Sequence, residues 1–478
     1  MSTSQTPPDP DLTGHMKGEP PGEHQSAKAA ASAWIGSALE YYDYFIYAAV
    51  AGTVFPQVFF PEGDDNLAMV AAMATFGVGY VARPIGAFVL GHLGDTIGRK
   101  KVLLFCMYVI GLSTMAVAFL PTYHQVGIIS PILLVTLRLI QGFAVAGEIS
   151  GASSMVLEHA PYGRRGFFGS FTLQGVQAGQ ILAAGVFIPL ATFLSDEAFT
   201  SWGWRIPFVL SFFVVIAGVI IRRTVHETPA FEEEVADGVK PDSPIIQAFR
   251  YSWPNMLRVM CMALMNTIPI VATTFGSLYA TQAAYGIEME KRIYFWIPLL
   301  GNLLAVLVIP MFGHLSDRIG RRPVMIGGCL LSGLSAFGYL KMIEQDNVVG
   351  AILMSLLMWG FFYQGYNAVF PAFYPELFPT KTRVSGMAIS QNTGTTITAA
   401  LAPVFAAVAQ PGTNVPLIVG AMAFGVTVLS ALAAFSAKET YRLHVNDLGT
   451  GATPPSKEEY ERLRTEAMAE YAAAKSGH

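Results

Sequence analysis

Charged residues are scarce in this sequence. Asp, Glu, Lys and Arg make up 13% of the 478 residues, against about 25% in an average soluble protein, whereas hydrophobic residues make up 53%. The formal net charge is -4, so the chain lacks the excess of Lys and Arg with which a protein binds nucleic acid. Composition therefore excludes a nucleic-acid partner and favours a chain that is surrounded by lipid.

The sequence also lacks the patterns of metal sites and of common hydrolases. Its three cysteines, Cys106, Cys261 and Cys329, lie inside apolar runs without CxxC or Cys/His spacing, so neither a metal site nor a disulfide framework is predicted. The motifs GxxxxGK[ST], HExxH and GxSxG are absent, which argues against an ATP-driven pump and against an enzyme. We expect no cofactor.

Long apolar segments dominate what is present. The N-terminal stretch has no apolar core of a cleaved signal peptide, and its Pro, Gly and acidic residues predict a disordered cytoplasmic tail at residues 1–28. Beyond it, apolar segments of about 20 residues recur, the length of helix that crosses about 30 Å of hydrocarbon. Twelve are predicted, at residues 31–55, 67–90, 101–120, 130–156, 167–192, 204–222, 255–280, 293–312, 323–341, 348–373, 384–408 and 415–436.

Positive charge is unevenly distributed over the loops between these segments. Lys and Arg gather after the even-numbered segments, at 99–101, 164–165, 222–223, 318–322, 381–383 and 438–442, and are rare in the other loops. Cytoplasmic loops retain positive charge because it resists translocation. We therefore predict a multi-pass protein of the bacterial inner (plasma) membrane with both termini in the cytoplasm.

Two repeated motifs divide the chain into halves. Gly91–Lys100 reads GHLGDTIGRK and Gly313–Arg322 reads GHLSDRIGRR, each between the second and third segments of its half. Glu158 and Glu376, after the fourth and tenth segments, each precede a Pro by three residues and an Arg by seven. The repeats predict six-helix bundles at residues 29–223 and 253–437, a cytoplasmic linker at 224–252 and a cytoplasmic tail with a short helix at 438–478.

The repeated G-x-L-x-D-x-x-G-R-[RK] loop in a chain of twelve helices resembles the major facilitator superfamily. Several stretches resemble its metabolite:proton symporter family, which includes carriers of shikimate, citrate, 2-oxoglutarate and proline or betaine. They are ALEYYDYFIY (38–47), ATFGVGYVARPIGA (74–87), PILLVTLRLIQGFAVAGE (131–148), SWGWRIPF (201–208) and HETPAF (226–231). The resemblance implies an all-α integral membrane fold of twelve transmembrane helices in two pseudo-symmetric six-helix bundles.

The repeated loop carries charges suited to a conformational gate. Asp95 comes just before a helix start, where exposed amides and the helix dipole favour a carboxylate, and Arg99 is placed to reach Glu158 on a neighbouring helix. The matching residues of the second half are Asp317, Arg321 and Glu376, and Gly91 and Gly313 begin the two turns. Pairs that break when the molecule opens would form a gate. Alternatively, these charges only anchor helix ends among the lipid headgroups.

Five ionisable residues fall inside apolar segments of the first half: Glu40, Asp43, Arg83, Arg138 and Glu148. An ion at the bilayer centre costs about 3 kcal/mol or more, so it is seldom retained without a use. We predict that a coupled proton is carried among the three acids, with Asp43 and Glu148 favoured, and that the two arginines bind an anionic or zwitterionic substrate. The alternative is a set of internal ion pairs that only hold helices together.

The second half offers uncharged polar groups near the middle of the membrane. Tyr363, Asn367 and Asn392 are the candidates for hydrogen bonds to a substrate. For each of them, a hydrogen bond between helices is the alternative.

These features favour a secondary active transporter that works by alternating access, as a monomer in the bilayer. The preferred function is proton-coupled symport, with uptake of a small carboxylate-bearing metabolite. Antiport that exports a metabolite or drug, uptake of zwitterions such as proline or betaine, and a receptor without transport activity remain open. The Gly-Pro-Gly-Gly signature expected of exporters is absent from the fifth segment, GFFGSFTLQGVQAGQILAAG, which counts against export.

Overall fold

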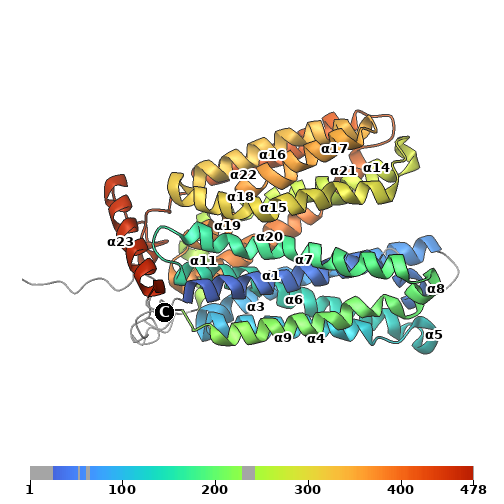
Figure 1. Ribbon diagram of the computed structural model, residues 1–478, viewed down its shortest axis with the longest axis horizontal. Coiled ribbons are helices and arrows are strands. Elements are labelled where there is room, and N and C mark those ends of the chain that lie inside the picture. The colour runs from blue at the N-terminus through green and yellow to red at the C-terminus, as the bar shows by residue number, and fades with distance from the viewer. Residues whose placement is uncertain (1–24, 52–53, 61–64, 229–242, 477–478) are drawn as a thin grey trace, which may run out of the picture.

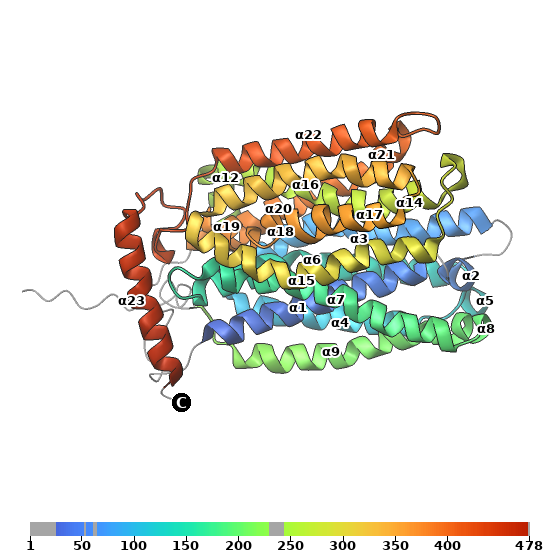
Figure 2. The ribbon, with the colours of Figure 1, turned by 45° about the horizontal axis from the view of Figure 1, so that its top comes forward.

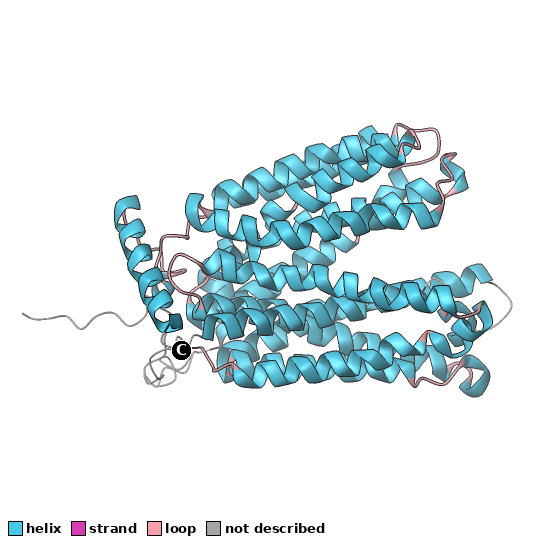
Figure 3. Cartoon of the chain, viewed as in Figure 1, coloured by secondary structure: helices cyan, strands magenta, loops and turns pink. Residues whose placement is uncertain are grey.

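The computed structural model describes residues 25–51, 54–60, 65–228 and 243–476. Within these ranges the chain forms helices joined by short loops, and no β-strand occurs (Figure 3). Most of the predicted N-terminal tail, residues 1–24, and residues 229–242 of the predicted linker lie outside the described residues. In the described part of the chain, nine helices are long and apolar enough to cross a membrane.

Six long helices build the first bundle. They are α1 (Gln25–Ala51), α3 (Asp65–Ile97), α4 (Arg99–Ala118), α6 (Ile129–His159), α7 (Arg165–Phe193) and α9 (Arg205–Thr224). α1 packs against α7 and α9, α3 packs against α6, and α4 packs against α6 and α9 (Figure 1). Short elements join them: α2 (Phe55–Phe59), α5 (Tyr123–Val126), α8 (Asp196–Ala198) and the π-helical turn η2 (Phe199–Gly203).

The second bundle also follows six helical paths, of which three are interrupted. The continuous helices are α15 (Lys291–Ile319), α16 (Arg321–Glu344) and α22 (Val415–Ser436). The first interrupted path holds α12 (Trp253–Ala263), η3 (Leu264–Asn266), α13 (Thr267–Pro269), η4 (Ile270–Phe275) and α14 (Gly276–Thr281). The others hold α17 (Val348–Ser355), η6 (Leu356–Phe362), α18 (Gln364–Asn367) and α19 (Phe370–Glu376), and then α20 (Arg383–Ala399) and α21 (Leu401–Val408). This arrangement fits the twelve predicted segments.

Short helices lie between and beyond these paths. They are α11 (Pro244–Tyr251), η5 (Ala283–Tyr285), η7 (Thr380–Thr382) and η8 (Val445–Asp447). The last helix, α23 (Lys457–Ser476), lies across one end of the molecule, where α1 also begins (Figure 2). We call this the α23 end.

Proline explains two of the interruptions. Pro269 and Pro371 lack the backbone N–H that would bond the carbonyl four residues earlier, so each removes one hydrogen bond from its helical path and weakens a regular α-helix there. A wider π-helical turn directly follows Pro269, at Ile270–Phe275, and another lies earlier on the path of Pro371, at Leu356–Phe362. Such turns are frequent at functional sites. The interrupted helices therefore place irregular backbone in the interior of the molecule.

Two pairs of helices make the most extensive contacts between the bundles, and α6 and α7 also contact α19 there. α7 packs against α15 and α3 packs against α20. Within the first bundle, the small residues of α3 and α6 let the two backbones approach, because a Cβ added at Gly142 would meet the carbonyl oxygen of Gly79, and one added at Gly86 would meet that of Phe143. Such contacts are typical of helix packing in membranes.

Candidate functional site

A cavity of about 460 Å³ lies between the two bundles. Its described wall includes Arg83 and aromatic, amide and hydroxyl side chains from both bundles: Tyr41, Tyr44, Phe45, Tyr80, Gln177, Gln180, Asn266, Thr273, Thr274, Trp359, Tyr363, Asn367, Phe370, Gln391, Asn392, Thr395 and Thr398. Four predicted substrate-binding residues, Arg83, Tyr363, Asn367 and Asn392, line it. The fifth, Arg138, does not belong to this wall.

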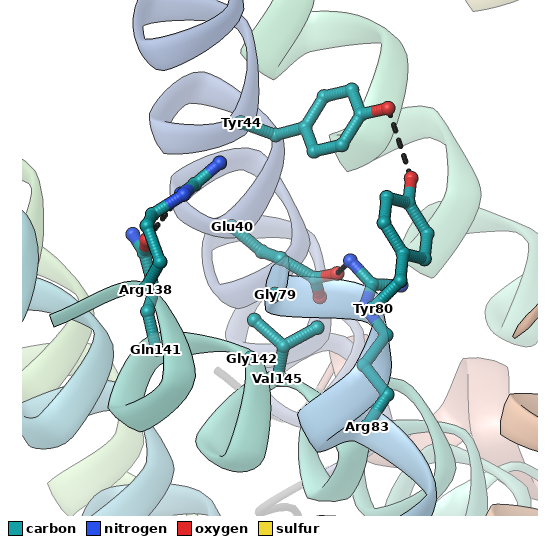
Figure 4. A pocket seen from close by; sticks show the side chains of 9 residues that line it. All are labelled: Glu40, Tyr44, Gly79, Tyr80, Arg83, Arg138, Gln141, Gly142 and Val145. Atoms are coloured by element: carbon teal, nitrogen blue, oxygen red, sulfur yellow. Dashed lines mark hydrogen bonds and ion pairs between the residues drawn. The ribbon is translucent and has the colours of Figure 1, made fainter. Parts of the chain in front are cut away.

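A second, smaller cavity of about 30 Å³ lies inside the first bundle, between α1, α3 and α6 (Figure 4). Its walls include Glu40, Tyr44, Tyr80, Arg83 and Arg138. Tyr44, Tyr80 and Arg83 also line the large cavity. These shared residues therefore form the partition between the two spaces.

In this partition, the guanidinium of Arg83 lies close to Glu40 and Tyr80. Its Nη2 lies 3.8 Å from Oε1 of Glu40, and its Cζ lies 4.5 Å from the centre of the Tyr80 ring. The Tyr80 hydroxyl donates to the Tyr44 hydroxyl at 2.9 Å. Both carboxylate oxygens of Glu40 are buried and have no hydrogen-bond partner within the described chain. The ion pair is thus a contact near the long end of the ion-pair range, and no hydrogen bond accompanies it in the described chain.

Asp43 and Arg138 belong to a buried polar network beside the small cavity. Asp43 accepts a hydrogen bond of 2.5 Å from the Thr114 hydroxyl, and that hydroxyl accepts one of 2.6 Å from Nε2 of Gln141. Gln141 in turn accepts a hydrogen bond from Arg138, whose Cζ lies 3.4 Å from the centre of the Tyr47 ring. The network connects α1, α4 and α6.

Glu148 pairs with Arg222 of α9, a partner that sequence reasoning missed. Nη1 of Arg222 donates to Oε2 of Glu148 at 2.9 Å and to the carbonyl oxygen of Leu103 at 2.6 Å, and its Nη2 contacts Oε1. Glu148 is absent from the walls of both cavities. The ion pair with Arg222 is what the alternative of a purely structural role expects of Glu148. Its role in proton coupling stays a prediction.

At the α23 end, Asp95 joins the first bundle to the second. Sequence reasoning expected Asp95 before the start of its own next helix, but it lies in α3, near that helix's end. It accepts hydrogen bonds from the backbone amides of Val384 and Ser385, at 3.1 and 2.8 Å, at the start of α20. The amides that favour this carboxylate thus come from the other bundle, because α3 and α20 pack together.

Asp317 makes the reciprocal connection from the second bundle to the first. Its two carboxylate oxygens accept hydrogen bonds of 2.8 Å from the amides of Gly166 and Phe167, at the start of α7. We call the two arrangements, Asp95 with the start of α20 and Asp317 with the start of α7, the crossed clasps. A Cβ at Gly91 would lie 2.9 Å from Cα of Ser385, and one at Gly313 would lie 2.6 Å from the Gly166 carbonyl oxygen. Both predicted glycines therefore allow the bundles to touch.

Arginines reinforce each clasp. Arg99 contacts Glu158 at 3.3 Å and Arg321 contacts Glu376 at 3.0 Å, so the two pairs expected from the sequence are present. Each acid also binds an arginine of the opposite bundle. These pairs are Arg383 with Glu158 at 2.6 Å and Arg165 with Glu376 at 3.3 Å. Sequence reasoning used Arg165 and Arg383 only as markers of the repeat and of topology.

Two further acids cap helices next to the clasps. Glu227 accepts hydrogen bonds from the amides of Arg99 and Lys100, at 3.0 and 3.2 Å, at the start of α4. Glu439 does the same for Arg321 and Arg322 at the start of α16, at 2.9 and 3.0 Å. The pseudo-symmetry of the two bundles thus includes loops outside the helices. In the sequence, this similarity is visible as the shared Glu-Thr pair of HETPAF at 226–231 and KETY at 438–441.

The α23 helix rests on both bundles. Tyr460, which is fully buried, packs its ring 5.4 Å from that of Tyr162 and 5.1 Å from that of Tyr441. Near the other end of the helix, the Tyr471 ring lies 6.1 Å from Phe168. Sequence reasoning predicted the helix but not its packing partners.

Comparison with known proteins places this architecture in a family. Residues 33–403 match the model described as Major Facilitator Superfamily, and residues 294–471 match it as well. The chain belongs to the major facilitator superfamily. It is a membrane-embedded transporter of small metabolites and not an enzyme.

Curated relatives resemble this transporter over most of its length. The inner membrane metabolite transport protein YhjE of Escherichia coli K12 is 34% identical over 414 residues, which cover 85% of this chain and 93% of that protein. The shikimate transporter of Escherichia coli K12 is 32% identical, over 80% of this chain and 87% of its own. The proline/betaine transporter of Salmonella typhimurium LT2 is 32% identical, over 90% and 86%.

A solved structure resembles this transporter in fold. It is the proton:xylose symporter XylE bound to 6-bromo-6-deoxy-D-glucose, with a TM-score of 0.72 and 18% identity. The match covers 89% of this chain and 98% of that one. At this identity the likeness concerns the fold alone.

Proposed function

We propose that this transporter is a proton-coupled symporter that takes up a small carboxylate-bearing metabolite by alternating access. In this proposal it lies in a bacterial inner membrane as a monomer, with both termini and the α23 end in the cytoplasm. Shikimate, proline and betaine, after which two relatives are named, each contain a carboxylate. A guanidinium in the cavity wall is suited to that group.

The observation that carries the proposal is the position of Arg83. It borders the large cavity on one side, and on the other it lies 3.8 Å from the buried carboxylate of Glu40. One cation thus stands between the space for a substrate and an internal acid. A substrate carboxylate and Glu40 are therefore competitors for the same guanidinium.

This competition supplies a coupling mechanism. A proton that enters from the periplasm neutralises Glu40, so Arg83 loses its internal partner and binds the carboxylate of a substrate. After the cavity opens to the cytoplasm, Glu40 releases the proton, regains Arg83 and displaces the substrate. One proton and one carboxylate are carried per cycle, and no uncompensated buried charge remains at either stage.

The other predicted proton carriers have different surroundings. Asp43 accepts a hydrogen bond from Thr114 and belongs to the network that includes Arg138, and Glu148 is held by Arg222. Both acids therefore have buried partners that stabilise their position. We propose Glu40 as the acid closest to the substrate path, with Asp43 and Glu148 as supporting charges.

The crossed clasps supply the alternation. While Asp95 and Asp317 hold the helix starts of the opposite bundle, the α23 end is closed. Release of these bonds would let the bundles separate at the α23 end. At the opposite end of the molecule, α7 would then approach α15 and α3 would approach α20, so that the cavity closes there. We propose that the clasped state is the one loaded from the periplasm.

Uptake into vesicles with an imposed pH gradient tests the proposal. Glu40→Gln keeps a neutral side chain, so we expect proton-driven accumulation to stop while exchange of substrate across the membrane continues. Arg83→Gln should lower both activities at least about tenfold, since a hydrogen bond to a charged group contributes about 1.5–3 kcal/mol. Arg250→Gln, at an exposed position of α11, serves as the matched control.

The same assay can overturn the proposal. Full accumulation by Glu40→Gln would remove Glu40 from the coupling role, and normal uptake by Arg83→Gln would refute carboxylate binding at Arg83. Loss of substrate from the vesicles, driven by an inward proton gradient, would indicate antiport instead of symport.

A further inference from the structure

The charge on the wall of the large cavity limits the substrate. Arg83 is the one side chain with a formal charge among the described wall residues, and no Asp, Glu, Lys or His accompanies it there. A substrate with one carboxylate would be neutralised by Arg83 when Glu40 is protonated. A second or third carboxylate would enter without a counter-ion, and an unpaired charge in a confined site is strongly unfavourable.

Two glutamines that line the cavity each have an amide oxygen without a hydrogen-bond donor in the described chain. Oε1 of Gln177 on α7 and Oε1 of Gln391 on α20 are buried without a partner in the described residues. Gln177 is 1% exposed and Gln391 is 8% exposed. Leaving such an acceptor unsatisfied costs about 1–3 kcal/mol, so a bound substrate that donates to it is favoured.

Neighbouring amides of the same wall already have partners. Asn367 donates to Gln364 at 2.9 Å, and Asn392 donates to the carbonyl oxygens of Ala146 and Ala388 at 3.1 and 2.8 Å. Gln180 accepts from Asn302, which in turn accepts from Trp359. The oxygen of Gln180 is thus occupied, whereas those of Gln177 and Gln391, which come from opposite bundles, are buried acceptors without a donor in the described residues.

The hydroxyls of the wall add further acceptors. Thr273, Thr395 and Thr398 each donate their proton to a carbonyl oxygen of their own helix, at 2.7, 2.9 and 2.8 Å. Their oxygens can then only accept from a ligand. These oxygens, together with the amide oxygens of Gln177 and Gln391, favour a substrate that donates hydrogen bonds. Hydroxyl groups supply such donors without adding charge, whereas a quaternary ammonium supplies none.

Flat aromatic faces complete the site. Trp359 and Tyr363 are stacked, with ring centres 4.9 Å apart and planes at 14°, and both line the cavity. Aromatic faces of this kind bury the C–H surface of a ring while its polar edge reaches amides and hydroxyls.

From these features we infer that the substrate is a polyhydroxylated monocarboxylic acid. Its carboxylate binds Arg83, its hydroxyls donate to Gln177 and Gln391, and its carbon skeleton packs on Trp359 and Tyr363. This inference rests on the proposed function, because it takes Arg83 to be the carboxylate site. It goes further in requiring one charge and several hydroxyl donors.

Ligand-induced thermal shifts of the purified protein test this inference, because a ligand that binds only the native state raises the unfolding temperature. The probes are quinate, a hydroxylated ring with one carboxylate, cyclohexanecarboxylate, which lacks the hydroxyls, citrate, and glycine betaine. We expect quinate to bind at least about tenfold more tightly than each of the others, since one hydrogen bond contributes about 1 kcal/mol and several are lost together.

Two variants test whether Gln177 and Gln391 bind the hydroxyl groups of the substrate. Gln177→Leu and Gln391→Leu should each weaken quinate binding several-fold and leave cyclohexanecarboxylate binding unchanged. Gln345→Leu, at an exposed loop position, is the matched control. Citrate or betaine binding as tightly as quinate, or equal losses for quinate and cyclohexanecarboxylate in the two variants, would overturn the inference.

Arg83→Gln separates this inference from the proposed function. If that variant loses all carboxylate binding while wild-type protein prefers citrate, the proposed function stands and the inference fails. If the variant binds every probe like the wild type, the proposed function itself fails.

Discussion

The hydroxyl of Tyr460 donates a hydrogen bond of 2.7 Å to the backbone carbonyl oxygen of Asp317. The side chain of Asp317 meanwhile accepts from the amides of Gly166 and Phe167 in the opposite bundle. The last helix of the chain is thus attached directly to one of the crossed clasps. Any motion that opens this clasp must also move or release α23.

Tyr460→Ala should therefore detach α23. The substitution removes a fully buried ring between Tyr162 and Tyr441, and such truncations typically cost about 3–5 kcal/mol in a protein core. We expect faster amide hydrogen exchange throughout α23 and along the loop at Tyr162. Tyr460→Phe keeps the ring and loses one hydrogen bond, so its effect should be near 1 kcal/mol.

Glu470→Ala is the control for this experiment, because Glu470 lies on the exposed face of the same helix. It should leave the exchange rates unchanged. Unchanged exchange in Tyr460→Ala as well would show that α23 is held by other contacts.

Asp95→Asn should weaken one crossed clasp and favour an open α23 end. The amide keeps the size of the side chain but cannot accept charge-assisted bonds with both oxygens, a loss of about 2 kcal/mol or a shift of roughly thirtyfold in the ratio of states. Spin labels on α3 and α20 should report a longer distance. Asp317→Asn should act similarly on α7 and α15, and the double variant should exceed either one. Distances identical to the wild type would show that the arginine pairs alone close this end.

The sequence predicted the ion pairs within each half at this end of the molecule. It did not predict the contacts that run from one bundle to the other. The repeat paired Arg99 with Glu158 and Arg321 with Glu376, because both members of each pair belong to one half. Arg165 and Arg383 could not be assigned from the chain, since their partners depend on how one half faces the other. The helix whose amides bind Asp95 was wrong for the same reason: these amides belong to Val384 and Ser385, 289 and 290 residues further along the chain.

Gly36→Ala should disturb the pair of Glu148 and Arg222. A Cβ at Gly36 would meet both Nη2 of Arg222 and Oε1 of Glu148, so one of these groups has to move. Overpacking of this kind costs about 1–3 kcal/mol, which should lower the unfolding temperature. Gly425→Ala, in α22, has no heavy atom within 4 Å of the added Cβ and is the matched control. Equal unfolding temperatures in both variants would contradict the close packing of α1 on this pair.

Glu227 should make stability depend on pH. Burial raises the pKa of this carboxyl above its ordinary value of 4.5, against the opposing effect of the amide hydrogen bonds. The folded state then holds the proton more tightly than the unfolded state, so the stabilisation is complete below pH 4.5 and is lost as the pH rises through the folded-state pKa. Gln at position 227 does not titrate. The unfolding temperature of Glu227→Gln, measured between about pH 4 and 7, should therefore lack the pH dependence that Glu227 contributes in the wild type. A wild-type stability that rises relative to the variant with pH would show that the amides dominate.

The internal site was harder to predict than the helices that carry it. Apolar length identified the segments, and the energetic penalty of buried ions identified Glu40 and Arg83. Arg222 was missed because its place at a helix end made it look like a topology signal. Gln391 was among the polar residues of the second half that suit hydrogen bonding but was not selected, and Gln177 was not named, because a glutamine in an apolar segment does not reveal whether a neighbouring helix satisfies it. Only the packed structure shows which amides still lack donors.

The residues that fasten the two bundles at the α23 end are almost entirely sealed from solvent. In the ion pairs that cross from one bundle to the other, the side chains of Arg383 and Glu158 show no exposure, and those of Arg165 and Glu376 are 2% and 0% exposed. Mobile ions in the surrounding solution screen buried pairs far less than surface pairs. The contacts between the bundles at this end should therefore stay nearly constant when the ionic strength of the surrounding solution changes, so a change of salt concentration alone should not shift the molecule between its closed and open states at this end.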